Sequence, residues 1–267
     1  MQELTIGFIG GGNMAEALIA GLRRAGHAGK HIFVAEPQQA RREFLTTHYQ
    51  VIAVEDNAAA TKRADLLVLA MKPQQMKVAL AGLDVHLKVD ASVISIAAGV
   101  STAALHEWLG ADANIVRVMP NTPALVAAGM SVLFSNADEI HKVRAEYLLN
   151  ACGESVRVEK EGQMHAVTAL SGSGPAYFFL LAEVLQATGE KLGLPADLAA
   201  KLAAQTALGA GKMLVESDRT SAELRHQVTS PGGTTQAALD MMYEMGLPDA
   251  VRKGVIAASK RSEELAG

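Results

Sequence analysis

The chain changes its pattern of apolar positions near Gly162. Before this point, short runs of consecutive apolar residues alternate with stretches of helical periodicity. Such runs are typical of parallel strands that are covered on both faces of a sheet. Strands alternating with helices predict an α/β fold with a doubly wound, mostly parallel sheet of the Rossmann type. The predicted strands are Ile6–Ile9, His31–Ala35, Asp65–Ala70, Ala91–Ile96, Ile115–Met119, Gly129–Phe134 and Glu154–Val158.

The rest of the chain shows helical periodicity and almost no strand signal. The expected helices are Met164–Leu170, Pro175–Leu192, Pro195–Glu216, Ser221–Val228, Thr234–Met245 and Pro248–Leu265. We therefore predict a dinucleotide-binding Rossmann domain over residues 1–161 and an all-helical domain over residues 162–267. The stretch Leu198–Leu214 has few charges on any helix face. This helix must be buried, either inside its own domain or against another subunit.

Composition excludes several classes of protein. The 267 residues are 49% hydrophobic and 19% charged, which allows a sizeable core. The net charge of −4 and the lack of a basic stripe argue against nucleic-acid binding. There is no basic leader, and no apolar stretch reaches the roughly 20 residues that span a membrane. Cys152 is the single cysteine, so no intrachain disulfide can form, and we expect a cytoplasmic protein without membrane partners.

A glycine-rich turn joins the first predicted strand to the first predicted helix. Gly10, Gly12 and Ala15 fit G-x-G-x-x-A, the dinucleotide-binding fingerprint. The first glycine allows a tight turn, the second lets the backbone approach a pyrophosphate, and Ala15 allows the helix to pack closely on the strand. The pyrophosphate would sit on free N–H groups at the positive helix end. The motif alone is weak evidence, but its place between strand and helix favours cofactor binding.

Other polar residues follow predicted strands on the same edge of the sheet. Glu36 ends the second strand, where an acid accepts hydrogen bonds from a ribose 2′-hydroxyl and repels a 2′-phosphate. Taken alone it favours NAD, yet Arg41 and Arg42 begin the next helix and could reach a phosphate, so the choice stays open. Lys72 follows another strand and could contact the cofactor. Ala97-Ala98 forms a small-residue turn against which a flat nicotinamide ring could lie.

Two glycine-rich turns interrupt the helical part. Ser171–Pro175 and Ser230–Thr235 each precede a predicted helix and offer backbone N–H groups and hydroxyls without a lysine or arginine. Such a turn can hold an anion. Because the Rossmann domain already accounts for the cofactor phosphates, we expect a small substrate carboxylate there.

Few residues in the second half suit acid–base work. His165 and His226 flank the two turns, but a lone helical histidine is more often structural. No cluster has metal-ligand spacing, and no Gly-x-Ser-x-Gly elbow is present. A reaction that needs little acid–base help is hydride transfer to a carbon–nitrogen double bond, because a protonated imine is already electrophilic.

Five stretches of the chain resemble the pyrroline-5-carboxylate reductase family. They are Gly7–Ala15, Ala70–Pro73, Val118–Pro123, Ala169–Tyr177 and Ser230–Thr235, and they occur in the family's order along the chain. The resemblance implies reduction of 1-pyrroline-5-carboxylate to L-proline with NAD(P)H, the last step of proline biosynthesis. It also implies a homodimer interlocked through the helical domain, with dimers assembled further into larger rings. The family commonly prefers NADPH, with NADH as a possible alternative.

The resemblance implies roles for individual residues. Those at the pyrophosphate would be Ile9, Gly10, Gly11, Gly12, Asn13 and Met14. Asn57 would meet the adenosine part, and the nicotinamide side would be lined by Ala70, Met71, Lys72, Pro73, Ala97 and Ala98. The substrate carboxylate would be held by Ser230, Gly232, Gly233, Thr234 and Thr235. Thr235 would be the catalytic residue, through a hydrogen bond to the ring nitrogen.

Two residues depart from the family pattern. Met71 stands where the family more often has valine, and Glu36 could shift the preference toward NADH.

Two other functions compete with the reductase. A 3-hydroxyacid dehydrogenase would need a lysine near the substrate, but none of Lys191, Lys201 and Lys212 lies near a glycine-rich turn in the sequence. A nucleotide-sensing protein without catalysis would need no second anion site, and the Ser230–Thr235 turn argues against it.

Overall fold

The computed structural model describes residues 1–266 of the chain. It forms two compact units. One comprises Met1–Gly172 and the C-terminal segment from Ala258 onward, and the other comprises Ser173–Ala257. We name them the Rossmann unit and the helical unit. The predicted division by function into residues 1–161 and 162–267 stays a prediction.

Eight strands of the Rossmann unit form one sheet in the order β3-β2-β1-β4-β5-β6-β7-β8. β7 pairs antiparallel with β6, and every other neighbouring pair is parallel. This confirms the predicted doubly wound, mostly parallel sheet. The strand order reverses between β1 and β4, and at such a switch point open α/β sheets bind ligands. The strands are β1 (Ile6–Ile9), β2 (Ile32–Ala35), β3 (Ile52–Val54), β4 (Leu66–Leu69), β5 (Ser92–Ser95), β6 (Asn114–Met119), β7 (Gly129–Phe134) and β8 (Gly153–Arg157).

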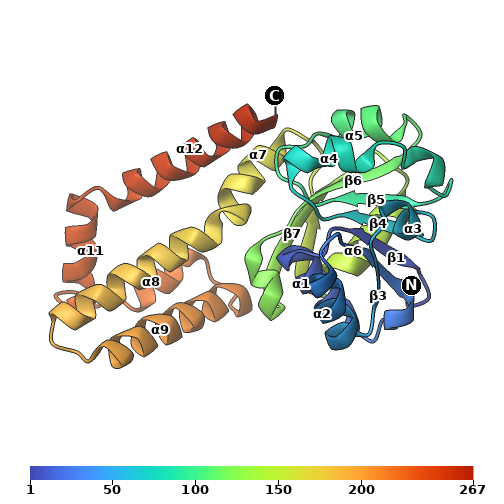
Figure 1. Ribbon diagram of the computed structural model, residues 1–267. Helices are drawn as coiled ribbons and strands as arrows, with labels where there is room; N and C mark the ends of the chain where they lie inside the picture. The colour runs from blue at the N-terminus through green and yellow to red at the C-terminus, as the bar shows by residue number, and fades with distance from the viewer. Residues whose placement is uncertain (267) are drawn as a thin grey trace. The chain divides into compact units, whose positions relative to one another are not determined.

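Helices cover both faces of this sheet (Figure 1). One core packs α1, α2 and α6 on the strands and includes Phe8, Leu18 and Leu148, and the other packs α3, α4 and α5 and includes Leu67 and Met76. Burial on both faces explains why the strands read as continuous apolar runs. The helices are α1 (Asn13–Arg24), α2 (Gln39–Tyr49), α3 (Asn57–Thr61), α4 (Pro73–Leu80), α5 (Thr102–Leu109) and α6 (Glu139–Leu149). The short 3-10 helices are Gly29–His31, Asp84–His86 and Thr122–Val126.

The segment that leaves the sheet is fixed by an ion pair between the buried Arg117 and the half-buried Glu161. After β8 the chain enters α7 (Gln163–Val167), then a π-helical turn at Thr168–Gly172. Just before α7, Glu161 accepts hydrogen bonds of 2.8 Å from the buried Arg117 of β6 and from both the N–H and the hydroxyl of Thr102. Burial alone would raise the pKa of Glu161, but these bonds and the Arg117 charge lower it below its usual value.

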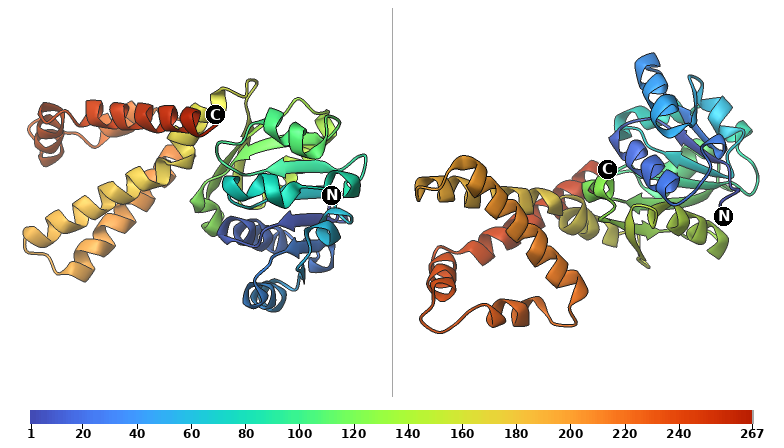
Figure 2. Two further views of the ribbon diagram at one scale, coloured as in Figure 1. Left: turned by 45° about the horizontal axis from the view of Figure 1, so that its top comes forward. Right: turned by 90° about the horizontal axis from the view of Figure 1, so that it is seen from below.

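The helical unit contains almost no core of its own. Its helices are α8 (Gly174–Lys191), α9 (Ala196–Glu216), α10 (Ser221–Gln227), α11 (Thr234–Glu244) and the first part of α12 (Leu247–Ala266). Figure 2 shows α8 and α9 side by side. Within Ser173–Ala257 the buried residues are Gly174, Ala199, Ala203 and Leu224.

Large apolar side chains of the helical unit remain exposed in the single chain. Phe178 and Phe179 of α8 are 64% and 66% exposed, and Leu202 and Leu208 of α9 are 50% and 53% exposed. The structure thus decides between the two interpretations of the apolar stretch in α9, because the chain's own core does not bury it. Contiguous apolar surface of this kind marks an interface.

Two buried histidines make the stability of the Rossmann unit sensitive to pH. His27 Nδ1 lies 2.9 Å from the Tyr147 hydroxyl, and His141 Nδ1 lies 2.7 Å from the Ser92 hydroxyl. Burial lowers the pKa of both histidines below the usual value, and positively charged neighbours add to the effect. Folding therefore disfavours the protonated form of both side chains.

We expect the free energy of unfolding to fall as the pH drops below about 6.5, the usual histidine pKa. In this pH range the unfolded chain binds protons at His27 and His141 that the folded chain does not bind. Protonation therefore stabilises the unfolded state. Each histidine contributes a slope of at most about 1.4 kcal/mol per pH unit. Denaturant unfolding at a series of pH values measures this slope.

Matched variants isolate the two histidines. His27→Gln combined with His141→Gln should flatten the slope, whereas His226→Gln, on an exposed part of α10, should leave it as it was. An undiminished slope in the double variant would contradict the assignment.

Candidate active site

The turn after β1 is shaped by contact with the end of β4. Gly10 donates its N–H to the Ala35 carbonyl at 2.8 Å, and Ala70 donates to the Ile9 carbonyl at 2.9 Å. Gly10 adopts φ +95°, and a Cβ there would stand 2.7 Å from the Ala70 carbonyl oxygen. Only glycine fits this backbone, because any other residue would meet both strain and a clash.

Gly12 leaves open space at the start of α1. It precedes the helix with φ −69°, no side chain caps the helix start, and nothing lies within 4 Å of the place where its Cβ would stand. The first N–H groups of a helix have no partner within it, so they face outward beside the exposed Gly12 and Asn13. A phosphate fits here both sterically and electrostatically.

The other residues expected at the nicotinamide follow strand ends on the same edge of the sheet. Ala70 and Met71 are half-buried after β4, and Lys72 is exposed at the start of α4, which Pro73 opens. After β5, Ala97 is buried at 5% exposure and Ala98 is exposed. Ala15 is fully buried beneath the glycine turn. The structure brings these positions to one edge, and their contact with a cofactor stays a prediction.

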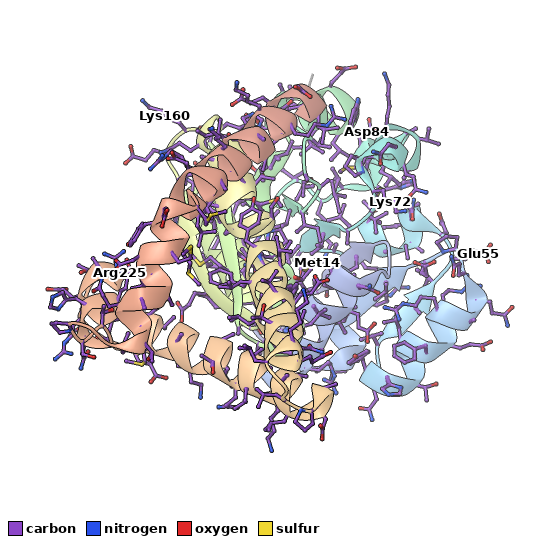
Figure 3. The ribbon with its side chains drawn as sticks, turned by 90° about the vertical axis from the view of Figure 1, so that its left-hand side faces the viewer. Met14, Glu55, Lys72, Asp84, Lys160 and Arg225 are labelled. Atoms are coloured by element: carbon purple, nitrogen blue, oxygen red, sulfur yellow. The ribbon has the colours of Figure 1, made fainter. Side chains whose placement is uncertain are left out.

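A pocket of about 460 Å³ lies beside the ends of β2 and β3. Its lining includes Pro37, Glu55, Asp56, Asn57 and His86. The Asn57 side chain donates to the Ala79 carbonyl at 3.2 Å and so ties α3 to α4. Figure 3 shows Glu55 and Lys72 projecting from the Rossmann unit. The pocket contains the residue expected at the adenosine, and its position suits the adenosine end of a dinucleotide.

The Ser230–Thr235 turn presents a helix N-terminus without a side-chain cap. Gly233 donates its N–H to the Ser230 carbonyl at 3.0 Å, and Gly232 adopts φ +71°, which glycine alone takes easily. The first bond inside α11 runs from Ala237 to Gly233 at 3.1 Å. The N–H groups of the residues between them thus have no partner in the helix. Thr235 is half-buried on this first turn.

The first residues of the Ser171–Pro175 segment are helical, and the expectation that this segment holds an anion stays a prediction. The backbone from Thr168 to Gly172 is a π-helix that continues α7, and the Ser171 hydroxyl donates to the Val167 carbonyl at 3.1 Å. Gly172 packs against the Met119 side chain, which a Cβ would strike at 2.3 Å. Gly172 thus serves close packing, whereas α8 begins at Gly174 without a side-chain cap.

Asn121 is a structural residue that sequence reasoning missed. Its side chain donates to the Ser171 carbonyl at 3.2 Å and accepts from the Met130 N–H at 2.9 Å, so it joins β7 to the π-helical turn. Its place between two prolines was the available signal. Of the two candidate histidines, His165 pairs with Ser262 at 3.0 Å, which suits a structural role.

Neither a cluster of metal ligands nor a membrane-spanning helix occurs in residues 1–266. No group of three or more His, Cys, Asp and Glu side chains there could hold a metal ion. No helix in this part of the chain is long and apolar enough to cross a membrane.

Comparison with known proteins identifies the family. Residues 161–265 match a model described as pyrroline-5-carboxylate reductase dimerisation, and residues 5–99 match one described as NADP oxidoreductase, coenzyme F420-dependent. All of the chain aligns at 45% identity with 98% of the pyrroline-5-carboxylate reductase of Pseudomonas aeruginosa. The Haemophilus influenzae enzyme is 42% identical, with 99% of this chain and 98% of that one covered. The chain belongs to the pyrroline-5-carboxylate reductase family.

Solved structures of pyrroline-5-carboxylate reductases share the whole fold. The Coxiella burnetii protein matches with a TM-score of 0.94 at 40% identity, covering 99% of both chains. The Plasmodium falciparum protein, solved with NADP bound, matches with 0.89 at 30% identity over 100% of both. This chain is thus an NAD(P)-dependent oxidoreductase that carries the dimerisation region of its family. Its match to an NADP oxidoreductase model supports NADPH use.

Replacing each of the two fingerprint glycines with alanine should affect a different property of the protein. Gly12→Ala should weaken binding of NADPH by about tenfold or more with little loss of stability, because its methyl enters the open space where the phosphate would approach. Gly10→Ala should lower stability by roughly 1–3 kcal/mol, because the backbone is left-handed there and faces the Ala70 carbonyl. Calorimetric titration and thermal unfolding separate the two effects, and tight binding by a stable Gly12→Ala protein would contradict this assignment.

Proposed function

We propose that this chain reduces 1-pyrroline-5-carboxylate to L-proline with NADPH or NADH, as the last step of proline biosynthesis. The observation that carries the proposal is identity of 40–45% with named pyrroline-5-carboxylate reductases over nearly the full chain. The open helix start of α11 supports it, because the substrate carries one carboxylate and no phosphate. A 3-hydroxyacid dehydrogenase has no comparable support.

The Rossmann unit holds the dinucleotide at the switch point of its sheet. Ile9 and the glycine turn to Met14 bind the pyrophosphate through backbone N–H groups, and Ala15 keeps α1 close beneath them. Asn57 and Glu36 meet the adenosine part. The nicotinamide side is formed by Ala70, Met71, Lys72, Pro73, Ala97 and Ala98. What supports these roles is that all the positions follow strands which end at one edge.

The Ser230–Thr235 turn holds the substrate carboxylate. The free N–H groups at the start of α11, the Ser230 and Thr234 hydroxyls and the flexible backbone of Gly232 and Gly233 form an anion site without a cationic side chain. A site of this kind balances one negative charge and leaves room for a flat, five-membered ring.

Reduction adds a hydride to the imine carbon, and the ring nitrogen ends as an amine. When bound, the reduced nicotinamide supplies this hydride. The Thr235 hydroxyl hydrogen-bonds the ring nitrogen and fixes the ring's orientation, and the turn's N–H groups hold the carboxylate. Positioning accounts for most of the rate, since the protonated imine needs little further activation.

The assembly proposed for this chain is a homodimer formed through the helical unit, with dimers joining into a larger ring in the cytoplasm. The match of residues 161–265 to a dimerisation family and the exposed apolar side chains of α8 and α9 support the dimer.

A turnover assay tests the reaction directly. Purified protein is mixed with 1-pyrroline-5-carboxylate and either NADPH or NADH, and loss of nicotinamide absorbance is followed. We expect turnover and formation of proline. A folded protein that turns over with neither cofactor would overturn the proposal.

Thr235→Ala should lower kcat by about a hundredfold while leaving the affinity for NADPH within a factor of about two. The reason is that the proposed contact of the hydroxyl is with the substrate's ring nitrogen. The residues assigned to the cofactor all belong to the Rossmann unit. Thr235→Ser retains a hydroxyl and should recover most of the rate. If Thr235→Ala turns over at the rate of the unaltered enzyme, the residue has no part in the mechanism.

Leu208→Asp should weaken the dimer and lower the melting temperature of the protein. Leu208 lies in the middle of α9 and is 53% exposed in the single chain, so a charge there would be buried in the dimer. Light scattering and circular dichroism measure both effects. Lys201→Asp, at an exposed polar position of the same helix, is the matched control. A Leu208→Asp protein that remains a stable dimer would show that α9 lies outside the interface.

A further inference from the structure

The carboxylate of Glu36 stands between the end of β2 and the phosphate-binding turn. Glu36 is 8% exposed. One oxygen accepts the Gly11 N–H at 2.9 Å, and the other accepts the Gln38 N–H at 3.0 Å. Each carboxylate oxygen has a second lone pair, so two acceptor positions remain. The carboxylate is thus held in place by backbone donors and still able to accept hydrogen bonds from hydroxyl groups.

The Arg41 guanidinium binds acceptors of the protein itself. Its Nε donates to the Gly11 carbonyl at 2.6 Å, and its guanidinium pairs with Glu16 at 2.5 Å. Tyr49 also donates to Glu16, at 2.8 Å. Burial alone would raise the pKa of Glu16, but these bonds and the Arg41 charge lower it below its usual value. The charge of Arg41 is balanced inside the protein.

Arg42 is turned back onto the end of β2. One of its nitrogens donates to the carbonyls of Glu36 and Pro37, both at 2.8 Å, and the other lies 3.5 Å from a Glu55 oxygen. Its side chain is 19% exposed. The two arginines that the sequence offered as phosphate ligands are therefore each paired with a carboxylate.

Carboxylates dominate this end of the cofactor edge. Glu55 and Asp56 line the pocket that also contains Asn57, and Glu36 stands between this region and the glycine turn. A 2′-phosphate carries nearly two negative charges at neutral pH. Placed beside an anchored carboxylate it is repelled, whereas a 2′-hydroxyl finds an acceptor there.

We propose that Glu36 is the specificity-determining residue at the adenosine end, so that this chain binds NADH at least as tightly as NADPH. NADPH remains usable but meets the Glu36 charge. The inference rests on the proposed function only in that the chain binds a nicotinamide dinucleotide. It assigns to this chain a cofactor preference that departs from the family's common preference for NADPH.

Direct binding to the complete protein tests the proposal without turnover. Calorimetric titration gives dissociation constants for NADH and NADPH, and for the fragments 5′-AMP and 2′,5′-ADP, which carry the adenosine end alone. We expect the ratio Kd(NADPH)/Kd(NADH) to be about 1 or higher in the unaltered protein and to drop by at least about fivefold in Glu36→Gln. 2′,5′-ADP should gain affinity in the same variant.

Matched variants separate a local contact from a general change in charge. Glu36→Gln keeps the size of the side chain and one oxygen for the Gly11 N–H, and Glu36→Ser provides a second variant should it unfold. Glu43→Gln makes the same change of charge at an exposed position of α2 and should leave the ratio within a factor of about two. Arg42→Gln removes a cation that contacts the Glu36 carbonyl and should raise the ratio.

The proposal is overturned if the unaltered protein binds NADPH about tenfold more tightly than NADH. It is equally overturned if both Glu36 variants leave the ratio unchanged, or if Glu43→Gln shifts it as far as Glu36→Gln. Absence of turnover with pyrroline-5-carboxylate would contradict the proposed function but would not alter these binding ratios, so the two failures are distinguishable.

Discussion

The contact between the Gly10 turn and the end of β4 is the constraint on which the cofactor edge depends. Gly10, in the left-handed region, lets the chain turn at a place where a Cβ would stand 2.7 Å from the Ala70 carbonyl oxygen. The Ala70 N–H in turn donates to the Ile9 carbonyl. β1 and β4 therefore stay paired to their last residues and diverge only beyond them. Because they diverge at the switch point, α1 and α4 both start at this edge. The site follows from backbone pairing before any polar side chain contributes.

A second set of contacts fixes the segment that leads out of the sheet. Glu161 is shared by Arg117 and Thr102, and Asn121 reaches the π-helical turn at Ser171. Removing one partner of a buried ion pair leaves an uncompensated charge, so such contacts hold geometry even where they add little net stability. They keep the first residues of the helical region in place against the Rossmann sheet.

The pattern of apolar positions was sufficient to predict most strands and helices. Strands that are buried on both faces of the sheet appear in the sequence as continuous apolar runs. The strand Gly129–Phe134 and the starts of the helices at Ser221 and Thr234 agree with the structure to the residue. At Ser171–Pro175, glycine and proline predict an interruption, whereas the backbone stays helical as far as Gly172, which packs on Met119, and α8 begins at Gly174. That contact joins positions far apart in sequence, which local pattern does not record.

The candidate site was predictable only as far as its motifs are local. The fingerprint glycines and the Ser230–Thr235 turn each predict the start of a helix. In the structure α1 begins directly after Gly12 and α11 directly after Gly233. The partners of Arg41 and Glu36 were not predictable, because Arg41 reaches Glu16 across 25 positions and Glu36 reaches Gly11 across the same separation. Whether an arginine faces solvent, a phosphate or a carboxylate depends on such pairings.

The two halves of the chain differ in what keeps them folded. The Rossmann unit buries two apolar cores within one chain, so its cofactor edge is preformed. The helical unit buries four of its residues and exposes the apolar faces of α8 and α9, so hydrophobic burial within one chain cannot offset the entropy of ordering it. Association then becomes part of folding for this half. The Ser230–Thr235 turn, which we propose as the carboxylate site, belongs to this half, whereas the glycine turn of β1 belongs to the Rossmann unit.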